Sequence, residues 1–191
     1  MGSLLEAIFT LSVGGLFLIA MMTSLVNLQA SAQDTSFQAT LNSVAEVQYR
    51  EIYDHLGKVG VLIEDQPILA AEPDNFVFQT KWDIVGDSLS SDTNRVSISL
   101  GDSTDTGYPV VTKQNGNPLP KSDAPIWLKD MTFTYFDINE NRIVTPDDSL
   151  DFIRSVRVDL EFFWQGSYTG PGERRVGTFL TFWKYFTNLY L

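Results

Sequence analysis

The sequence contains no cysteine among its 191 residues. This absence excludes a disulfide-stapled fold, a thiolate metal site and a thiol nucleophile. It says little about the compartment, because many exported domains fold without disulfides. Apolar residues make up 43% of the chain, so a small domain of this length can bury a core without cross-links.

Basic residues are also few, with 13 Lys and Arg against 24 Asp and Glu and a formal net charge of −11. Nucleic-acid binding needs a basic surface that displaces counterions from phosphates, so we expect no nucleic-acid partner. The acid excess favours solubility and a hydrated surface. A saline habitat or cation binding would favour the same composition.

Histidine is nearly absent, and His55 is its only occurrence. A lone histidine near a helix end is usually a polar surface residue or a partner of the helix dipole. The sequence shows no Ser/His/Asp set, phosphate-binding glycine loop or zinc-ligand spacing. We therefore expect no catalytic site and no enzyme activity.

One long hydrophobic run is present, because Glu6 is the only charged residue from Leu4 to Leu28. A helix of this length spans about 37 Å, enough to cross a hydrocarbon core of about 30 Å. The alternative is a cleaved signal peptide, with Ala30-Ser31-Ala32 as its cleavage site. Met1-Gly2-Ser3 lacks the basic n-region of a signal peptide and the run exceeds a usual h-region, so a retained helix is favoured.

Glu6 is anomalous in this run, since an ionised carboxylate inside a bilayer is unfavourable and usually has a partner. One interpretation places Glu6 at the membrane interface, near the positive end of the helix dipole. The other pairs it with the free amino terminus of a neighbouring subunit. The first Lys or Arg of the chain is Arg50, so the α-amino group is the only cation near the start.

The segment Ser3-Leu4-Leu5-Glu6-Ala7, followed by an unbroken apolar stretch, resembles the N-terminus of type IV prepilins. Gly14 and Gly15 lie where small residues let such helices pack closely. The resemblance implies an assembly segment formed by Leu4, Leu5, Glu6, Gly14 and Gly15. Glu6 departs from the family position by one residue, late if the mature chain starts at Met1 and early if cleavage follows Gly2.

Three later stretches extend the resemblance to minor pilins and pseudopilins of the J and W types. Tyr53–Gly60 resembles the segment that closes their long helix, Met131–Asn141 their strand and Asp/Asn-rich turn, and Ile153–Leu160 the strand that follows. The resemblance implies a structural subunit of a type IV pilus-like extracellular filament, assembled by packing of N-terminal hydrophobic helices. The alternatives are a minor pseudopilin of a type II secretion system or pilus-priming tip complex, and a single-pass membrane-tethered binding module.

The resemblance also implies partners and a location. The partners are copies of itself or other pilins in a helical filament, the prepilin peptidase and the assembly machinery. The subunit would sit in the inner (cytoplasmic) membrane before assembly and then in an extracellular or cell-surface filament.

The stretch from Gln29 to Leu56 contains neither proline nor glycine. Its apolar residues recur at helical spacing: Phe37, Leu41, Val44, Ala45, Ile52 and Leu56. This pattern predicts an amphipathic continuation of the membrane helix, ended by Gly57 and Gly60. We expect one helix from about Leu4 to Leu56, and segments 1–28, 29–60 and 61–191 as membrane helix, amphipathic helix and β-rich head.

The head contains short β-type runs between turn signals. Strands are expected at 76–82, 95–100, 126–136, 153–164 and 176–185, and loops at 88–93, 101–107, 115–118 and 169–172. The fold class is therefore α+β, with a long N-terminal transmembrane-plus-amphipathic helix packed against an antiparallel β-sheet domain.

The stretch Asp137–Asp148 resembles a calcium loop, whose cation takes six to eight oxygen ligands. The candidate ligands are Asp137, Asn139, Asn141, the Ile143 carbonyl, Thr145 and Asp148. Arg142 stands where such loops place glycine, and the last ligand is Asp rather than Glu. The alternative, slightly favoured, is a turn in which Asn and Asp bond their own backbone. Calcium is the one candidate cofactor.

The C-terminal stretch Thr178–Leu191 is rich in aromatic residues. A final core strand is the favoured interpretation for Phe179 or Phe182. The alternative is that alternate aromatic side chains face a neighbouring subunit.

Overall fold

The computed structural model describes residues 2–104, 107–120, 128–165 and 175–189. The chain divides into two units, Met1–Ala39 and Thr40–Leu191, and each is described by itself. The boundaries drawn above at residues 28 and 60 remain predictions.

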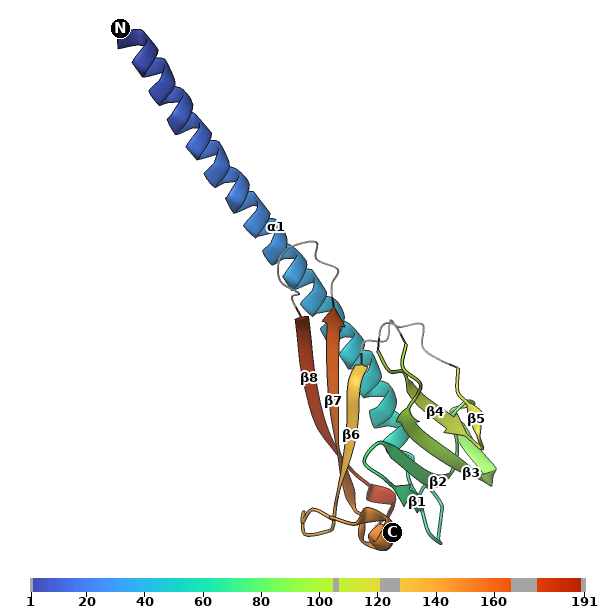
Figure 1. Cartoon of the computed structure of the whole chain (residues 1–191). Coiled ribbons are helices and arrows are strands. Elements are labelled where there is room, and N and C mark those ends of the chain that lie inside the picture. Colours follow the sequence, from blue (N-terminus) through green and yellow to red (C-terminus); the bar gives the residue numbers. More distant parts are fainter. Residues whose placement is uncertain (1, 105–106, 121–127, 166–174, 190–191) are drawn as a thin grey trace. The chain divides into compact units, whose positions relative to one another are not determined.

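Helix α1 (Gly2–Leu56) runs through all 55 residues without interruption (Figure 1), which confirms the expected continuous helix. It ends where two glycines were expected to end it. The Gly57 N–H donates to the carbonyls of Tyr53 and Asp54, both at 3.1 Å, and the Gly60 N–H leaves the helix for the Gln79 carbonyl at 3.0 Å. Gly60 has a φ of +70°, and a Cβ there would lie 2.4 Å from Leu189 Cδ2, so this exit from the helix requires glycine.

The second unit contains two antiparallel sheets (Figure 1). The five-stranded sheet has the order β1-β2-β3-β4-β5, and the three-stranded sheet has the order β6-β7-β8. The strands are β1 (Ile68–Ala71), β2 (Asn75–Asp83), β3 (Ser88–Leu100), β4 (Val110–Gln114), β5 (Asn117–Pro118), β6 (Leu128–Phe136), β7 (Ser155–Gln165) and β8 (Arg175–Tyr185). Two 3₁₀ helices follow strands of the second sheet, η1 (Pro146–Phe152) and η2 (Thr187–Leu189). The α+β class is confirmed, with two sheets in place of one.

The core of the second unit joins the last turns of α1 to the inner faces of both sheets. From α1 it takes Leu41, Val44, Ala45, Ile52 and Leu56, all buried. This is the apolar face that the sequence periodicity indicated, except that Phe37 lies in the first unit and is only half-buried. Phe76 of β2 lies at the centre of an aromatic cluster, with ring centroids 5.6 to 6.0 Å from its neighbours. These neighbours are Phe78, Phe133, Tyr135 and Phe186.

The two sheets are also joined by hydrogen bonds near Glu72 and Pro73. The Phe133 N–H donates to the Pro73 carbonyl at 2.7 Å, and the Tyr135 hydroxyl donates to the Glu72 carbonyl at 2.8 Å. Burial is the main cause that raises the pKa of Tyr135 well above its ordinary value. This hydroxyl therefore stays protonated, and it satisfies a carbonyl at the junction of the sheets.

Several strands differ from the sequence prediction. The five expected runs each overlap a strand, but residues 126–127 lie outside the described residues, and Ile153 and Arg154 precede β7. Strands β1, β4 and β5 were not foreseen because each has five residues or fewer. The expected loop 88–93 is wrong, since these residues form the start of β3. Their side chains are mostly solvent-exposed on both faces, so no apolar alternation marks them as a strand. The expected loop 115–118 is wrong at its end, where Asn117–Pro118 form β5. The expected loop 169–172 lies outside the described residues.

We predict that Phe76→Ala destabilises the second unit by about 3–5 kcal/mol, because it empties the centre of the aromatic cluster. The matched control is Phe179→Ala, which removes an aromatic ring that is 64% exposed and should leave stability nearly unchanged. The measurement is chemical unfolding of the full chain in detergent, followed by tryptophan fluorescence. Equal loss of stability in both variants would contradict the core assignment.

Candidate functional site

The apolar run of α1 keeps its large side chains exposed in the first unit. Leu4 is 70%, Phe9 71% and Leu11 81% exposed. Among the described residues one helix is long and apolar enough to cross a membrane, judged by length and composition, and it is α1. An apolar surface of this extent needs lipid or other protein to cover it, so the helix suggests a membrane anchor or a signal segment.

Three hydroxyl groups of this segment donate hydrogen bonds within the helix. Thr10 Oγ1 donates to the Glu6 carbonyl at 2.7 Å, Ser12 Oγ to the Ile8 carbonyl at 2.8 Å, and Thr23 Oγ1 to the Ile19 carbonyl at 2.9 Å. Such bonds hide polar groups from a surrounding apolar medium. The three hydroxyls are therefore compatible with lipid or with a neighbouring apolar helix.

Glu6 is exposed on this helix. The ion pairs found among the described residues do not include its carboxylate, and the Thr10 hydroxyl binds its main-chain carbonyl instead. Met1 and the side chain of Leu5 lie outside the described residues. Pairing of Glu6 with an amino terminus therefore stays a prediction.

Gly14 and Gly15 are both helical. A Cβ added at either position would meet nothing within 4 Å, so no contact within the described chain requires glycine there. Glycine inside a helix lowers its stability by about 1 kcal/mol relative to alanine. Small residues let helices approach closely, so glycine at both positions is compatible with close packing against other helices.

The Asp/Asn-rich segment after β6 forms a compact turn. Asp137 Oδ1 accepts hydrogen bonds from the N–H groups of Asn139 and Asn141, both at 2.8 Å, and Asp137 Oδ2 accepts one from Asn141 Nδ2 at 3.1 Å. The Asp137 N–H donates to the Asn141 carbonyl at 3.0 Å. This is the self-bonded turn that was weighed against a calcium loop.

The structure separates the candidate calcium ligands into two groups along the chain. Asp137, Asn139 and Asn141 meet in the turn, whereas Thr145 precedes η1 and Asp148 lies inside it. The Ile143 N–H donates to the Tyr135 carbonyl at 2.9 Å. No cluster of three or more His, Cys, Asp or Glu side chains that could hold a metal occurs in the described part of the chain. Calcium binding by a set that includes amide and carbonyl oxygens remains a prediction.

Calcium binding at this turn can be tested by its effect on thermal stability. If the six oxygen-bearing residues hold the ion, adding calcium should raise the melting temperature of the wild type, because a ligand of the native state stabilises it. Asp137→Ala should then abolish the rise. Identical melting curves in calcium and in chelator would contradict calcium binding and leave the self-bonded turn as the interpretation.

A second prediction concerns pH. Hydrogen bonds from the Asn141 side chain, the Asn141 backbone and the Asn139 backbone lower the pKa of Asp137. A lowered pKa contributes stability above the ordinary Asp value of about 3.9, and this contribution is lost as pH falls through the lower folded pKa. The stability difference between wild type and Asp137→Ala should therefore be full at neutral pH and should shrink in acid. A difference that is constant with pH in chemical unfolding would contradict this.

The C-terminal aromatics divide between the core and the surface. Phe182 is buried, with its ring 4.8 Å from that of Tyr49 on α1, as expected for a core strand. The same expectation for Phe179 is wrong, because the alternation of β8 turns it to the outer face and leaves it 64% exposed. Trp183 and Tyr185 share that face at 39% and 47% exposure.

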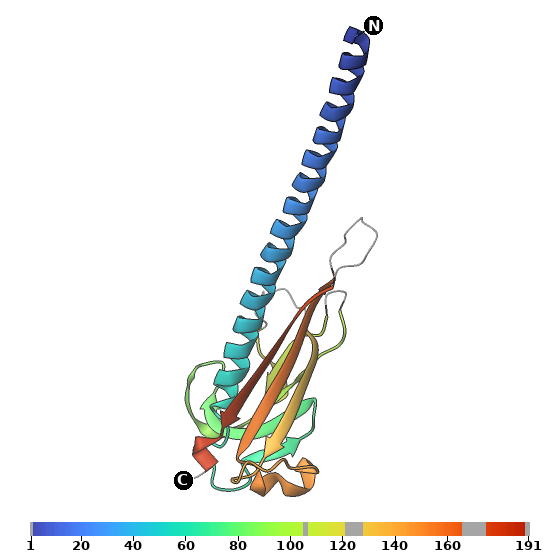
Figure 2. The same ribbon diagram turned by 90° about the vertical axis from the view of Figure 1, so that its left-hand side faces the viewer.

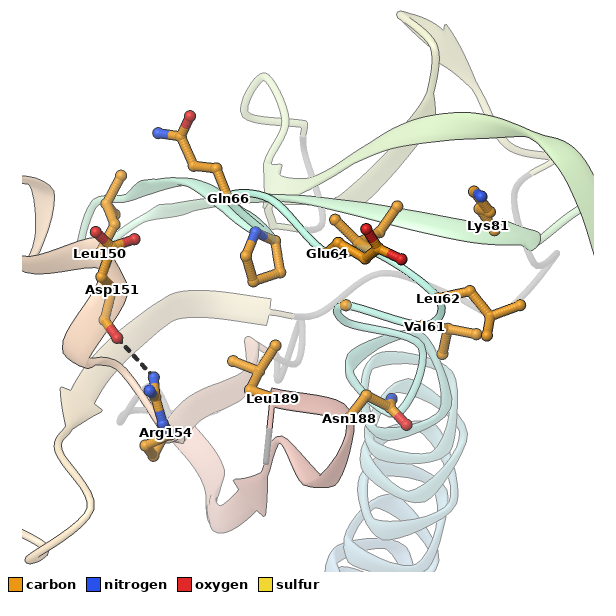
Figure 3. Close-up of a pocket in the computed structure, with 13 residues that line it drawn as sticks. Val61, Leu62, Glu64, Gln66, Lys81, Leu150, Asp151, Arg154, Asn188 and Leu189 are labelled. Carbon is orange, nitrogen blue, oxygen red and sulfur yellow. Dashed lines mark hydrogen bonds between the residues drawn. The ribbon is translucent and has the colours of Figure 1, made fainter. Parts of the chain in front are cut away.

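A pocket of about 760 Å³ lies at the end of α1 in the second unit (Figure 3). The loop after α1 supplies Val61, Leu62 and Glu64, and β2 supplies Lys81. On the other side Leu150, Asp151, Arg154, Asn188 and Leu189 line it. The Arg154 guanidinium donates to the Asp151 carbonyl at 2.7 Å, and Asn188 Nδ2 donates to the Val59 carbonyl at 3.0 Å.

The pocket combines apolar walls with two acids and two bases, so it has no single charge that would select an anion or a cation. Leu62 and Gln66 adopt φ of 55° and 44°, a left-handed conformation that non-glycine residues rarely take. Nothing in the sequence pattern marked this pocket, because its lining residues come from segments that lie far apart in the sequence. The bonds of Arg154 and Asn188 give both side chains a structural role.

His55 lies outside this pocket. Its Nδ1 is 3.3 Å from Thr112 Oγ1 on β4, and burial lowers its pKa. The expectation of a surface position is thus only partly right, because His55 on α1 is half-buried against β4 of the five-stranded sheet. The sequence assigned His55 no catalytic role, and this stays a prediction.

Comparisons with protein-family models, with curated proteins and with solved structures return no match for this chain. The likeness to pilins is therefore one of shape. It consists of a long apolar N-terminal helix whose end packs against antiparallel sheets.

Proposed function

We propose that this protein is a structural subunit of a type IV pilus-like filament and acts by assembly rather than by catalysis. The observation that carries the proposal is the combination of two surfaces on one uninterrupted helix. The large apolar side chains described between Leu4 and Leu28 are exposed, whereas Leu41, Val44, Ala45, Ile52 and Leu56 are buried in the second unit. A filament of packed helices covers the first surface while the second keeps each domain attached.

The same architecture is compatible with a minor pseudopilin of a secretion system or a pilus-priming tip complex. The resemblance of Tyr53–Gly60, Met131–Asn141 and Ile153–Leu160 to the J and W types favours this second candidate. A membrane-tethered binding module shares the anchor but needs no subunit contacts. Under either filament candidate the partners are other pilin-like subunits, the inner membrane before assembly, a prepilin peptidase and the assembly machinery.

Glu6 separates assembly from simple anchoring. In a filament the anchor helices leave the bilayer and pack in an apolar core, where a carboxylate is strongly unfavourable unless a cation meets it. The amino terminus of an adjoining subunit is the cation that the sequence offers, because no Lys or Arg precedes Arg50. Pairing would neutralise both charges and fix the axial stagger between subunits.

We predict that Glu6→Gln leaves the membrane-inserted protein folded and abundant but lowers its incorporation into filaments at least several-fold. The matched control is Glu46→Gln, in which an exposed acid of the same helix, paired with Arg50, is neutralised outside the apolar run. The measurement is the ratio of subunit sheared from cells to subunit kept in the membrane.

Normal assembly of Glu6→Gln would refute the pairing mechanism. A wild type that never leaves the membrane would instead support the tethered binding module. Mass spectrometry of the sheared material would also identify the mature N-terminus, on which the register of Glu6 depends.

A further inference from the structure

The turn between β4 and β5 carries the only Asn-Gly pair of the sequence, Asn115-Gly116. The two residues have φ of 52° and 83°, and Gln114 pairs with Asn117 across them. Two residues of positive φ between paired strands form the tight hairpin turn that Asn-Gly favours. Both residues are solvent-exposed, so water and base can reach them.

An Asn-Gly pair is prone to lose the side-chain ammonia, because glycine has no side chain to hinder ring closure. The Gly116 main-chain nitrogen attacks Asn115 Cγ and a new N–Cγ bond forms. The Cγ–Nδ2 bond breaks, and ammonia leaves with the proton of the Gly116 N–H. Water then opens the cyclic imide at Cγ to give aspartate, or at the main-chain carbonyl to give isoaspartate. Nothing is oxidised or reduced in either step.

In the folded chain both ends of the Asn115 amide are bonded to β3. Asn115 Oδ1 accepts from the Arg95 N–H at 2.9 Å, and Asn115 Nδ2 donates to Asn94 Oδ1 at 2.8 Å. The Asn115 N–H also donates to the Arg95 carbonyl at 2.8 Å. These bonds hold the amide toward β3, so Cγ can turn onto the Gly116 nitrogen only after they break.

The amide of Asn94 fixes which group position 115 must present. Asn94 is 5% exposed, and its Nδ2 donates to the Trp82 carbonyl at 3.2 Å. Since a carbonyl only accepts, the Asn94 nitrogen faces Trp82 and its oxygen faces Asn115. An ionised carboxylate at position 115 offers acceptors alone. Deamidation therefore sets two acceptor oxygens against each other and leaves a nearly buried oxygen without a donor, which is destabilising.

The turn lies where local opening is easy. Two register pairs join β4 to β5, at Lys113–Pro118 and Gln114–Asn117, and Pro118 has no N–H to donate. Figure 1 shows β5 at one margin of the five-stranded sheet, and Figure 2 shows that sheet behind the three-stranded one. The junction of the sheets is near the opposite margin, at the turn between β1 and β2. The tip of the hairpin can thus open without breaking the junction.

We propose that Asn115-Gly116 is a site of spontaneous deamidation, gated by the hydrogen bonds to Asn94 and Arg95, and that its product weakens the five-stranded sheet. The reaction proceeds from the open form of the turn, so its rate in the folded chain follows the population of that form. Because ammonia is lost, the modified form accumulates with the age of the subunit. The proposal concerns the chain itself and does not depend on filament assembly.

The gate can be tested on the wild-type full chain in detergent. Samples are kept in mildly alkaline buffer with and without urea, and conversion is followed by peptide mass spectrometry with fragmentation. We expect conversion at Asn115 to be at least several-fold faster in urea. Asn117 is the internal control on the same tryptic peptide, because Pro118 offers no N–H for ring closure. Equal rates with and without urea would refute the gate, and no conversion in urea would refute the site.

The role of the amide pair is tested by Asn94→Ala, which removes the acceptor of Asn115 Nδ2. Conversion in the folded chain should rise several-fold, while the rate in urea stays the same. The matched control is Thr112→Ala on β4, a residue 6% exposed that contacts His55 rather than the Asn115 amide. Equal acceleration by Thr112→Ala would indicate general loosening and contradict the specific gate. The wild-type comparison needs no variant, so it tests the gate even if Asn94→Ala does not fold.

The effect of the product is tested by Asn115→Asp against Asn117→Asp, which adds the same charge at another exposed position of the hairpin. At neutral pH Asn115→Asp should lower the urea midpoint of the head and Asn117→Asp should leave it nearly unchanged. The loss should shrink in acid, because a protonated carboxyl can again donate to Asn94 Oδ1. Failure of Asn115→Asp alone to fold would be the same result in stronger form. Equal midpoints, or a loss that does not change with pH, would refute the weakening by acceptor repulsion.

Discussion

The structure depends on one constraint, the need to cover the apolar surface of an unbroken 55-residue helix. In the second unit this surface is covered by the protein itself, since Leu41, Ile52 and Leu56 are almost fully buried. In the first unit nothing comparable is present, and the large apolar side chains remain exposed. Burial of apolar area is the main favourable term in both folding and association. The same helix can therefore stabilise a domain at one end and demand lipid or neighbours at the other.

The helix and the strong strands could be predicted because their signals are local. Apolar spacing from Leu41 to Leu56 indicated the buried face of α1, and the alternation in 76–82 indicated β2. The short strands β1, β4 and β5 could not, because they depend on neighbours distant in sequence. The stretch 88–93 misled for the same reason, since its strand character comes from pairing of Ser88 and Leu89 with Asp83 and Trp82 rather than from side-chain alternation.

The candidate site was predictable only in part. The assembly residues were chosen from a linear motif, and the structure shows them on an exposed helix but supplies no partner for Glu6. The Asp137 turn was foreseen as an alternative to calcium, because short polar side chains bond their own backbone. Phe179 was misassigned because period-2 alternation fixes which residues share a face but not which face is buried. The pocket beside η2 could not be found from sequence at all.

The junction of the two sheets has a mechanical consequence. The hydrogen bonds to Glu72 and Pro73, together with the rings around Phe76, tie strands of one sheet to strands of the other. Neither sheet can open without exposing these groups. The free energy of locally opening either sheet should therefore be close to the free energy of unfolding the whole head. Backbone amides on both sheets should exchange with solvent as one slow cooperative set, and a protease would meet a domain that resists partial digestion.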